Sequence, residues 1–279
     1  MNAWAALRLQ IEWGADEALE TVPVDRLRPI GTVAPDAPSP RLGRFSNETT
    51  APGAPPDVKS GFGAPSGAAN RAAEQAAALA AGATTIAELR AAVAAFTGCA
   101  LRDTATSLVF AEGDAAPSLI APSLMLIGDA PGPDDDRAGR PFAGASGAYL
   151  DRMLASIGLN RDMLLLTPVI PWRPPGDRMP SPTELAACLP FLWRLIILAA
   201  PSHVMLLGPI AARNLLPANP RRRTRGAWVN LAVPGMLAKV PALSGISPAA
   251  LLRQPSLRRE AWADLRKIRR AIDKNITKP

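Results

Sequence analysis

Four short segments in the second half of the chain combine residue types that could do chemistry together. In the first, the strand-forming residues 124–127 lead into the run Gly128-Asp129-Ala130-Pro131-Gly132. A buried strand that ends in a Gly/Pro turn with one carboxylate is how an α/β sheet presents a polar group to a ligand at its carboxyl edge. Asp129 could position or polarise a water molecule there. The structural alternative is an ordinary strand-to-helix turn.

The second segment places an aromatic ring close to that turn. It follows the acidic residues 134–136 and reads Arg140-Pro141-Phe142-Ala143-Gly144. A phenylalanine fixed between proline and small residues, beside a strand-end carboxylate, suits stacking on a planar base. A core phenylalanine under a loop is the alternative.

The third and fourth segments carry arginine beside proline or leucine. The third runs from Thr167 and Pro168 to Arg178 and is fixed by four prolines, which leaves Arg173 and Arg178 available for phosphates. The fourth reads Ser247-Pro248-Ala249-Ala250-Leu251-Leu252-Arg253. Its leucines could wedge into a base stack while arginine holds the backbone, or Ser247 could simply cap a helix.

These segments need a framework, and the chain from about residue 99 supplies one. Short apolar runs predict strands at 107–110, 124–127, 163–167, 203–207, 228–233 and 239–243. Apolar residues at helical spacing predict a helix over 146–157, one that starts at the capping box Ser181–Glu184, and a last helix over 257–272. The alternation predicts an α/β fold class, three α/β/α layers around a mainly parallel sheet.

The first third of the chain reads differently. Residues 1–33 predict an N-terminal helical segment, and residues 34–70, rich in proline, glycine and alanine, predict a flexible linker. Residues 71–95 hold 13 alanines, which predicts one or two helices broken near Gly82. Residues 96–279 would then form the folded domain that carries the four segments.

Charge is unevenly placed along the chain. The net charge is +7, but residues 201–279 hold 15 lysines and arginines against three acidic residues, for +12. A basic block beside a folded core indicates DNA as a partner, although a solvated basic tail would look the same. The two cysteines, the absence of a signal-peptide pattern and the lack of a long apolar run predict a cytoplasmic protein without membrane contact, and we expect a monomer.

Taken in order, the four segments resemble the motifs of the uracil-DNA glycosylase superfamily, most closely the bacterial and archaeal family 4 type. The resemblance covers about residues 99–272. The run at 128–132 is similar to Gly-Glu-Ala-Pro-Gly and the run at 140–144 to Arg-Pro-Phe-Val-Gly. The runs at 172–178 and 247–253 are similar to Cys-Arg-Pro-Pro-Gly-Asn-Arg and His-Pro-Ala-Tyr-Leu-Leu-Arg. Four ordered matches are far more specific than any one of them.

The resemblance implies a DNA-repair glycosylase that flips uracil or a related damaged base out of DNA and hydrolyses its N-glycosidic bond. The catalytic residues that it implies are Asp129 and Ser247. The implied substrate-binding residues are Gly128, Ala130, Pro131, Gly132, Phe142 and Pro168, with Phe142 stacked on the base. The implied DNA-binding residues are Arg173, Arg178, Leu251, Leu252, Arg253, Arg258 and Arg259, with one of the leucines filling the gap in the base stack.

Three positions depart from the family motifs. Asp129 stands where members have glutamate, and its carboxylate reaches one methylene less far. Pro168 stands where they have an asparagine that hydrogen-bonds the uracil edge, and proline has no side-chain donor. Ser247 stands where they have a histidine that stabilises the departing uracil anion. The only histidine of the chain, His203, opens a predicted buried strand and suits a structural role.

The iron–sulfur ligands of family 4 are also incomplete here. Members hold a [4Fe–4S] cluster with four cysteines, and Cys99 and Cys188 match two of these positions. Phe96 and Trp172 occupy the other two, where a buried aromatic contact could fill the space. We therefore expect no cofactor and no metal site, the alternative being a cluster as in family 4.

Two functions from different classes stay open at this point. The first is a divergent, cluster-free DNA glycosylase in which Asp129 orients water and Phe142 stacks on the base. The second is a catalytically degenerate member that binds DNA without excising a base. A different nucleobase or nucleotide substrate, suited to a more apolar pocket, is a third and weaker possibility.

Overall fold

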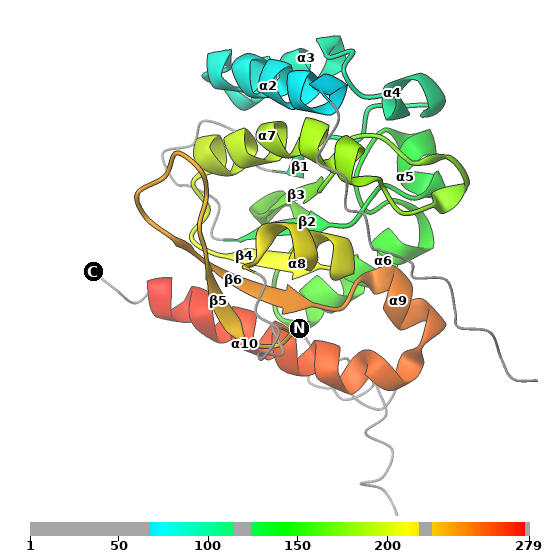
Figure 1. Ribbon diagram of the computed structural model, residues 1–279. Coiled ribbons are helices and arrows are strands. Elements are labelled where there is room, and N and C mark those ends of the chain that lie inside the picture. The colour runs from blue at the N-terminus through cyan, green and yellow to red at the C-terminus, as the bar shows by residue number, and fades with distance from the viewer. Residues whose placement is uncertain (1–66, 114–123, 218–224, 277–279) are drawn as a thin grey trace, which may run out of the picture. The chain divides into compact units, whose positions relative to one another are not determined.

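The computed structural model describes residues 67–113, 124–217 and 225–276, all of which belong to one compact unit. At its centre lies a six-stranded sheet in the order β1-β3-β2-β4-β6-β5 (Figure 1). The four inner strands run parallel: β2 (Met125–Gly128), β3 (Leu165–Pro168), β4 (Val204–Leu207) and β6 (Val240–Gly245). The antiparallel edge strands are β1 (Glu112–Gly113) and β5 (Trp228–Leu231). The sheet is thus mixed and mostly parallel.

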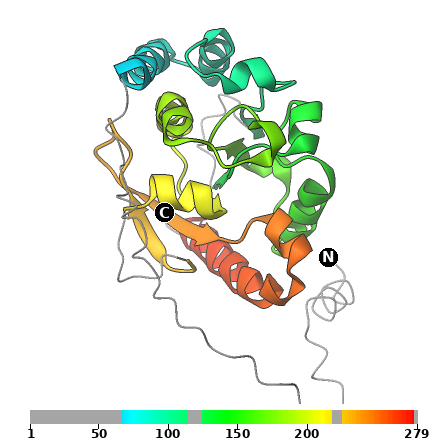
Figure 2. The same cartoon turned by 45° about the vertical axis from the view of Figure 1, so that its right-hand side comes forward.

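Helices cover both faces of this sheet, as Figures 1 and 2 show from two sides. On one face lie α7 (Pro182–Ala199) and α8 (Pro209–Leu215); on the other lie α6 (Gly144–Ser156), α9 (Pro248–Arg253) and α10 (Arg258–Ile276). Within β2, Met125 and Ile127 belong to the hydrophobic core between the sheet and α7, whereas Leu126 belongs to the core between the sheet and α6 and α10. The three-layer α/β/α fold predicted from the sequence is confirmed.

The alanine-rich segment belongs to the same compact unit. It forms α2 (Gly67–Gly82) and α3 (Ile86–Ala95), and α2 packs along the outer side of α7. Ala76 and Ala80 are buried in this contact, because small side chains let two helices approach closely. Arg194 of α7 also donates two hydrogen bonds, at 2.9 and 2.6 Å, to the carbonyl of Ala83. The helices therefore add a layer outside α7.

The predicted strand at 107–110 is wrong. Val109 and Phe110 are buried, but their backbone is irregular, and the amide of Val109 bonds to the carbonyl of Pro171 at 2.8 Å. A buried loop and a short buried strand give the same apolar pattern in sequence, which explains the error. The edge strand that pairs with β3 is β1, which begins two residues after the predicted strand ends. The helical segment predicted at 1–33 lies outside the described residues, as do residues 34–66 of the linker predicted at 34–70. The last four residues of that predicted linker, 67–70, form the start of α2.

The remaining elements are short. α4 (Leu101–Thr104) follows the first cysteine, and α5 (Pro133–Ala138) contains the acidic run. Three single-turn 3₁₀ helices lie at Arg161–Met163, Pro175–Asp177 and Pro255–Leu257.

One described helix, α7, is long and apolar enough to span a membrane by length and composition alone. Its residues Phe191, Leu195 and Ile196 are almost completely buried, and they pack in the core on the sheet face that α7 covers. Because α2 covers its outer side, α7 has the surroundings of a core helix.

Candidate active site

The four segments meet at the carboxyl edge of the parallel strands. β2 leads to Asp129, β3 to the proline-rich loop, β4 to α8, and β6 to α9. The chain passes from β2 to β3 on one side and then enters β4 on the other, so the strand order reverses between β2 and β4. Open α/β sheets bind ligands in the crevice at such a switch point.

A cavity of about 330 Å³, here called the Asp129 cavity, occupies this crevice. Its walls come from the turn after β2, the loop after β3, Ile210 of α8 and Ala249 of α9. Six of the residues predicted from the sequence line it together: Asp129, Ala130, Pro131, Gly132, Arg178 and Arg253. Its volume lies within the range of small-molecule sites.

The carboxylate of Asp129 points across the switch point toward the start of α8. Its Oδ1 accepts a hydrogen bond of 2.9 Å from the amide of Ala211. Gly208 permits this approach, since a Cβ there would lie only 2.2 Å from Oδ2 of Asp129, and its φ of 135° also requires glycine. The shorter aspartate side chain is therefore held against a second loop of the site.

Burial raises the pKa of Asp129 above its usual value of 3.8. The amides of Ala211 and Ile210, and then the charge of Arg213, act in the opposite direction and favour the ionised form. A carboxylate offers about four lone-pair sites, so the hydrogen bond from the Ala211 amide leaves others free to accept from a water molecule.

The ring of Phe142 packs directly on the end of β2. A Cβ on Gly128 would lie 2.7 Å from Cζ of Phe142, so glycine is required for this contact. Phe142 also has a φ of 51°, in the left-handed region that residues with a Cβ rarely adopt. The sequence prediction that an aromatic ring lies beside the strand end is thus correct in position, and the surroundings must hold the strained backbone.

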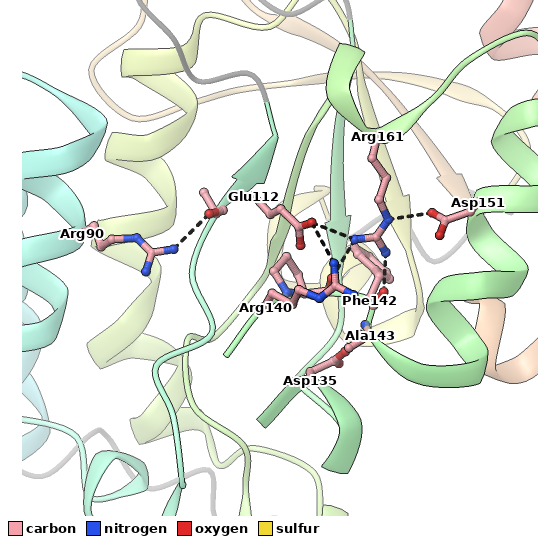
Figure 3. Close-up of polar contacts among 10 residues, drawn as sticks. Arg90, Glu112, Asp135, Arg140, Phe142, Ala143, Asp151 and Arg161 are labelled. Atoms are coloured by element: carbon pink, nitrogen blue, oxygen red, sulfur yellow. Dashed lines mark hydrogen bonds and ion pairs between the residues drawn. The ribbon is translucent and has the colours of Figure 1, made fainter. Parts of the chain in front are cut away.

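Two charged side chains hold the peptide group between Phe142 and Ala143 from opposite sides (Figure 3). Oδ1 of Asp135 accepts from the amide of Ala143 at 2.6 Å, while its Oδ2 accepts from the amide of Gly132 at 2.9 Å. One carboxylate thus ties the turn after β2 to the Phe142 loop. From the other side, the guanidinium of Arg161 donates to the carbonyl of Phe142.

Arg161 extends this clamp to the edge of the sheet and to α6. Its Nε donates to Asp151 at 2.6 Å, and its Nη1 donates to Glu112 of β1 at 3.2 Å. Oε1 of Glu112 also accepts a hydrogen bond of 3.5 Å from Nη1 of Arg140. The Arg161 side chain is only 16% exposed, so these bonds replace most of its hydration. We call Asp135 and Arg161 the Phe142 clamp.

Neither residue of the clamp is predicted from the sequence. Asp135 lies in an acidic run that reads as solvent-exposed, and Arg161 stands outside all four segments. A weak signal was available for Asp135, because an acidic residue three positions after Gly132 suits the first turn of a helix.

Pro168 lies away from the Asp129 cavity. It pairs with Gly128 in the sheet and lines a small apolar space of about 10 Å³ together with Phe110 and Phe191. That space is on the α7 side of the sheet and is too small for a ligand. Neither of the two predicted substrate contacts beside the strand ends is among the residues that line the Asp129 cavity. Phe142 packs on Gly128, next to the cavity turn, and Pro168 belongs to the core.

Ser247 caps α9. Its Oγ accepts a hydrogen bond of 3.3 Å from the amide of Ala250, which is the structural role considered in the sequence analysis. It lines a second cavity, between α8 and α9, instead of the Asp129 cavity. Asp129 and Ser247 thus line two neighbouring cavities, and their joint catalytic role stays a prediction from the sequence.

Leu251 and Leu252 have opposite surroundings. Leu251 is completely buried in the core beneath α9 and cannot reach DNA without unfolding the helix. Leu252 is 40% exposed and is the leucine that could enter a base stack.

The two arginines of the proline-rich loop are held by carboxylates. Arg173 pairs with Asp177 at 2.8 Å, and Arg178 makes two hydrogen bonds to Glu184, at 2.9 and 2.6 Å. The bonds from Arg178, followed by those from Ser181, lower the pKa of Glu184 from 4.5 to about 2. A DNA phosphate would have to compete with these partners.

The arginines of the C-terminal helix differ among themselves. Arg259 is exposed, whereas Arg258 is half-buried over the ring of Tyr149, 5.8 Å from its centroid. Arg269 pairs with Asp273 at 2.7 Å. In Figure 1, α10 begins near α9 and runs away from the carboxyl edge, so its first turn lies nearest the site.

The two cysteines lie together without further ligands. Cys188 donates a hydrogen bond to Cys99 with 3.8 Å between the sulfurs, and both are buried. This bond, together with burial, raises the pKa of the Cys188 thiol well above its usual range. Phe96 and Trp172 are buried in the same core, and the Phe96 ring meets Phe191 edge-on at 5.2 Å.

These residues do not fit a [4Fe–4S] cluster, which is held by four thiolates. Two of the matching positions carry the aromatic side chains of Phe96 and Trp172, which have no thiolate. The described residues contain no group of three or more His, Cys, Asp or Glu side chains placed to hold a metal ion.

The fold and the cavity define an α/β protein with a ligand site at a topological switch point. Comparison with protein families matches residues 118–266 to the Uracil DNA glycosylase superfamily. The Type-4 uracil-DNA glycosylase of Pyrobaculum aerophilum is 39% identical over 145 residues, 51% of this chain and 74% of that protein. The enzyme of the same name from Archaeoglobus fulgidus is 37% identical over 175 residues, 61% of this chain and 84% of that protein. The chain belongs to the uracil-DNA glycosylase superfamily, and its similarity is to the type-4 members.

Proposed function

We propose that this protein is a DNA glycosylase that excises uracil or a related damaged base. The observation that carries the proposal is the Asp129 cavity, whose half-buried carboxylate lies at the switch point and directly follows Gly128, on which the clamped ring of Phe142 packs. The relatives named Type-4 uracil-DNA glycosylase support the same activity. In the reaction, a water oxygen bonds to C1′ of the sugar as the glycosidic C–N bond breaks, and the base leaves with the bonding electrons and is then protonated.

Asp129 would orient this water, and the ring of Phe142 would stack on the flipped base. Flipping costs a few kcal/mol, which stacking and contacts in the cavity offset. The Phe142 clamp keeps the ring on the strand end while the base enters. Arg178 and Arg253, which line the cavity, would contact the flanking phosphates.

We propose further that no iron–sulfur cluster is needed. The buried side chains of Phe96, Trp172 and Phe191 fill the core where a cluster would otherwise connect the helices. Iron content and visible absorbance of the purified protein test this proposal, and stoichiometric iron with a charge-transfer band would contradict it.

The second candidate function is DNA binding without excision. It is favoured by two observations, because Pro168 offers no donor to a base and Ser247 does not line the Asp129 cavity. The fold and the basic C-terminal region would then serve recognition alone.

Single-turnover excision from oligonucleotides that contain uracil, hypoxanthine or xanthine separates the two functions. We expect excision of the base from at least one substrate. Asp129→Asn should lower the single-turnover rate of this excision by about 10²–10⁴-fold, the range for loss of an acid–base group. Asn keeps an oxygen for the Ala211 amide, so the fold should persist. Because the Asp129 pKa is raised, the rate should fall as the pH drops through a value above 3.8.

Asp103→Asn is the matched control, since Asp103 is exposed on α4 and is not among the residues that line the Asp129 cavity. It should excise at nearly the wild-type rate. No product on any substrate, with DNA binding intact, would establish the second function instead.

A further inference from the structure

A second cavity, here called the α8–α9 cavity, lies at the carboxyl ends of β4 and β6. It has a volume of about 350 Å³ and is lined by the start of α8, the end of β6 and the first turn of α9. Neighbouring residues on the same helices line the Asp129 cavity: Pro209 and Ala250 face one cavity, Ile210 and Ala249 the other. The two cavities are therefore adjacent, with α8 and α9 between them.

The charges around the α8–α9 cavity are basic. Its charged lining residues are Arg213 of α8 and Arg225, and no aspartate or glutamate is among the described residues that line it. Arg225 is partly neutralised, because it pairs with Glu260 of α10. For Arg213, the described part of the chain supplies neither an ion pair nor a side-chain hydrogen bond. This guanidinium is exposed and its five donors are free for a ligand.

Two hydroxyl groups add donors beside the arginines. Ser247 accepts a bond from the amide of Ala250, which leaves its O–H free to donate into the cavity. Ser244, only 5% exposed, is the other hydroxyl residue of the lining. A site built from guanidinium and hydroxyl donors without a carboxylate suits an anion with several acceptor oxygens, and a phosphate group meets that requirement.

We propose that the α8–α9 cavity binds a backbone phosphate of the DNA strand whose base occupies the Asp129 cavity, with Arg213 as its main ligand. The proposal rests on the proposed function for the identity of the strand. The adjacency of the cavities suits neighbouring groups of one strand, and the charge of Arg213 also acts on Asp129. The same phosphate chemistry could come from free phosphate, so the test must separate the two sources.

The main test compares Arg213→Gln with the wild-type protein in binding to a duplex that carries a stable abasic analogue. Loss of one phosphate contact should weaken binding several-fold at low salt and reduce the slope of log K against log salt by about one. Arg71→Gln is the matched control, because Arg71 is exposed on α2, in the layer outside α7. Its slope should equal that of the wild-type protein.

A set of duplexes, each with one neutral methylphosphonate linkage near the abasic analogue, locates the contact. At one linkage the neutral substitution should weaken the wild-type protein but leave Arg213→Gln unchanged. Equal slopes for Arg213→Gln and wild type would overturn the proposal. So would binding of inorganic phosphate, detected by its ³¹P signal, with DNA affinity unaffected by the variant.

This outcome does not depend on catalysis. If the wild-type protein excises no base but Arg213→Gln still loses one unit of salt slope, the proposed glycosylase activity fails and the phosphate site stands. If excision is found and the slopes are equal, the reverse holds.

Discussion

The loop after β2 and the first turn of α9 are held in different ways. In the loop, side chains from elsewhere in the chain fix the backbone, as Arg161 and Asp135 do at the peptide group between Phe142 and Ala143. In the turn, a local hydrogen bond fixes the backbone, since Oγ of Ser247 accepts from the amide of Ala250 in its own helix. The first region resembles the family motif in sequence and is supported by tertiary contacts. The second carries a serine in place of the motif histidine and is held by its own helix cap.

The two regions therefore differ in role: residues of the first position the site, whereas the motif position in the second is one that would contact the substrate. The clamp positions a ring and a carboxylate, and neither clamp residue needs to touch the base. Pro168 and Ser247 stand where the family pattern has groups that touch it. The predictions below change one region at a time.

The largest effect should come from restoring the polar group in the second region. Ser247→His should raise the single-turnover rate of uracil excision by about 10²-fold, because one donor to developing negative charge is typically worth about 10²–10³. Ser247→Asn, which keeps a helix cap without an imidazole, is the control and should gain less. A soluble Ser247→His variant with no gain would mean that the backbone, and not the missing donor, limits the site.

Removing the centre of the clamp should cost the most stability. Arg161→Met leaves Glu112, Asp151 and the carbonyl of Phe142 without their common donor, and we expect a loss of about 2–3 kcal/mol in the free energy of unfolding by urea. Arg137→Met is the matched control. Arg137 is 73% exposed, so breaking its pair with Asp134 should cost less than about 0.5 kcal/mol.

A smaller loss should follow when the carboxylate of the clamp becomes an amide. Asp135→Asn can accept from one amide only, and its NH₂ group then faces the second N–H donor. We expect a loss of about 1–2 kcal/mol, with faster hydrogen exchange at Ala143. Equal exchange at Ala143 in Asp135→Asn and Asp134→Asn would show that Arg161 alone holds the loop.

The smallest effect concerns the loop after β3, whose arginines are held by carboxylates. The pKa of Glu184 is lowered from 4.5 to about 2, so the charged form stabilises the fold above pH 4.5 and this contribution is lost as the pH falls toward 2. Because Arg178 is half-exposed, the contribution should be about 1 kcal/mol. In Glu184→Gln this part of the pH dependence of unfolding should disappear. An unchanged profile would mean that other carboxyls dominate.

Much of the fold follows from local patterns in the sequence. Five of the six predicted strands are present, and so are the helices near 146–157, 182–199 and 257–272. In each of them, the spacing of the apolar residues is that of the strand or helix that forms. Gly158, with a φ of 72°, follows the end of α6. The strand at 107–110 failed because burial of an irregular segment leaves the same apolar run.

The site was predictable only in part. The turn at Asp129 was recognisable, since glycine and proline after a strand are local signals. The burial of Leu251 and the exposure of Leu252 were not, because adjacent residues on a helix differ only in which face meets the core. Arg161 gave no signal, since nothing in its neighbours shows that it becomes buried.

The sequence by itself determined the family, the parallel sheet and the position of the carboxylate turn, because these depend on residue spacing along one stretch of chain. The tertiary structure decided which of the motif side chains meet. It brought Asp129 to α8, placed Pro168 in the core, gave Ser247 to a helix cap and left Arg213 facing a cavity. These outcomes depend on how β2, β4 and β6 lie side by side, and residues that are distant in sequence become neighbours only when the sheet forms.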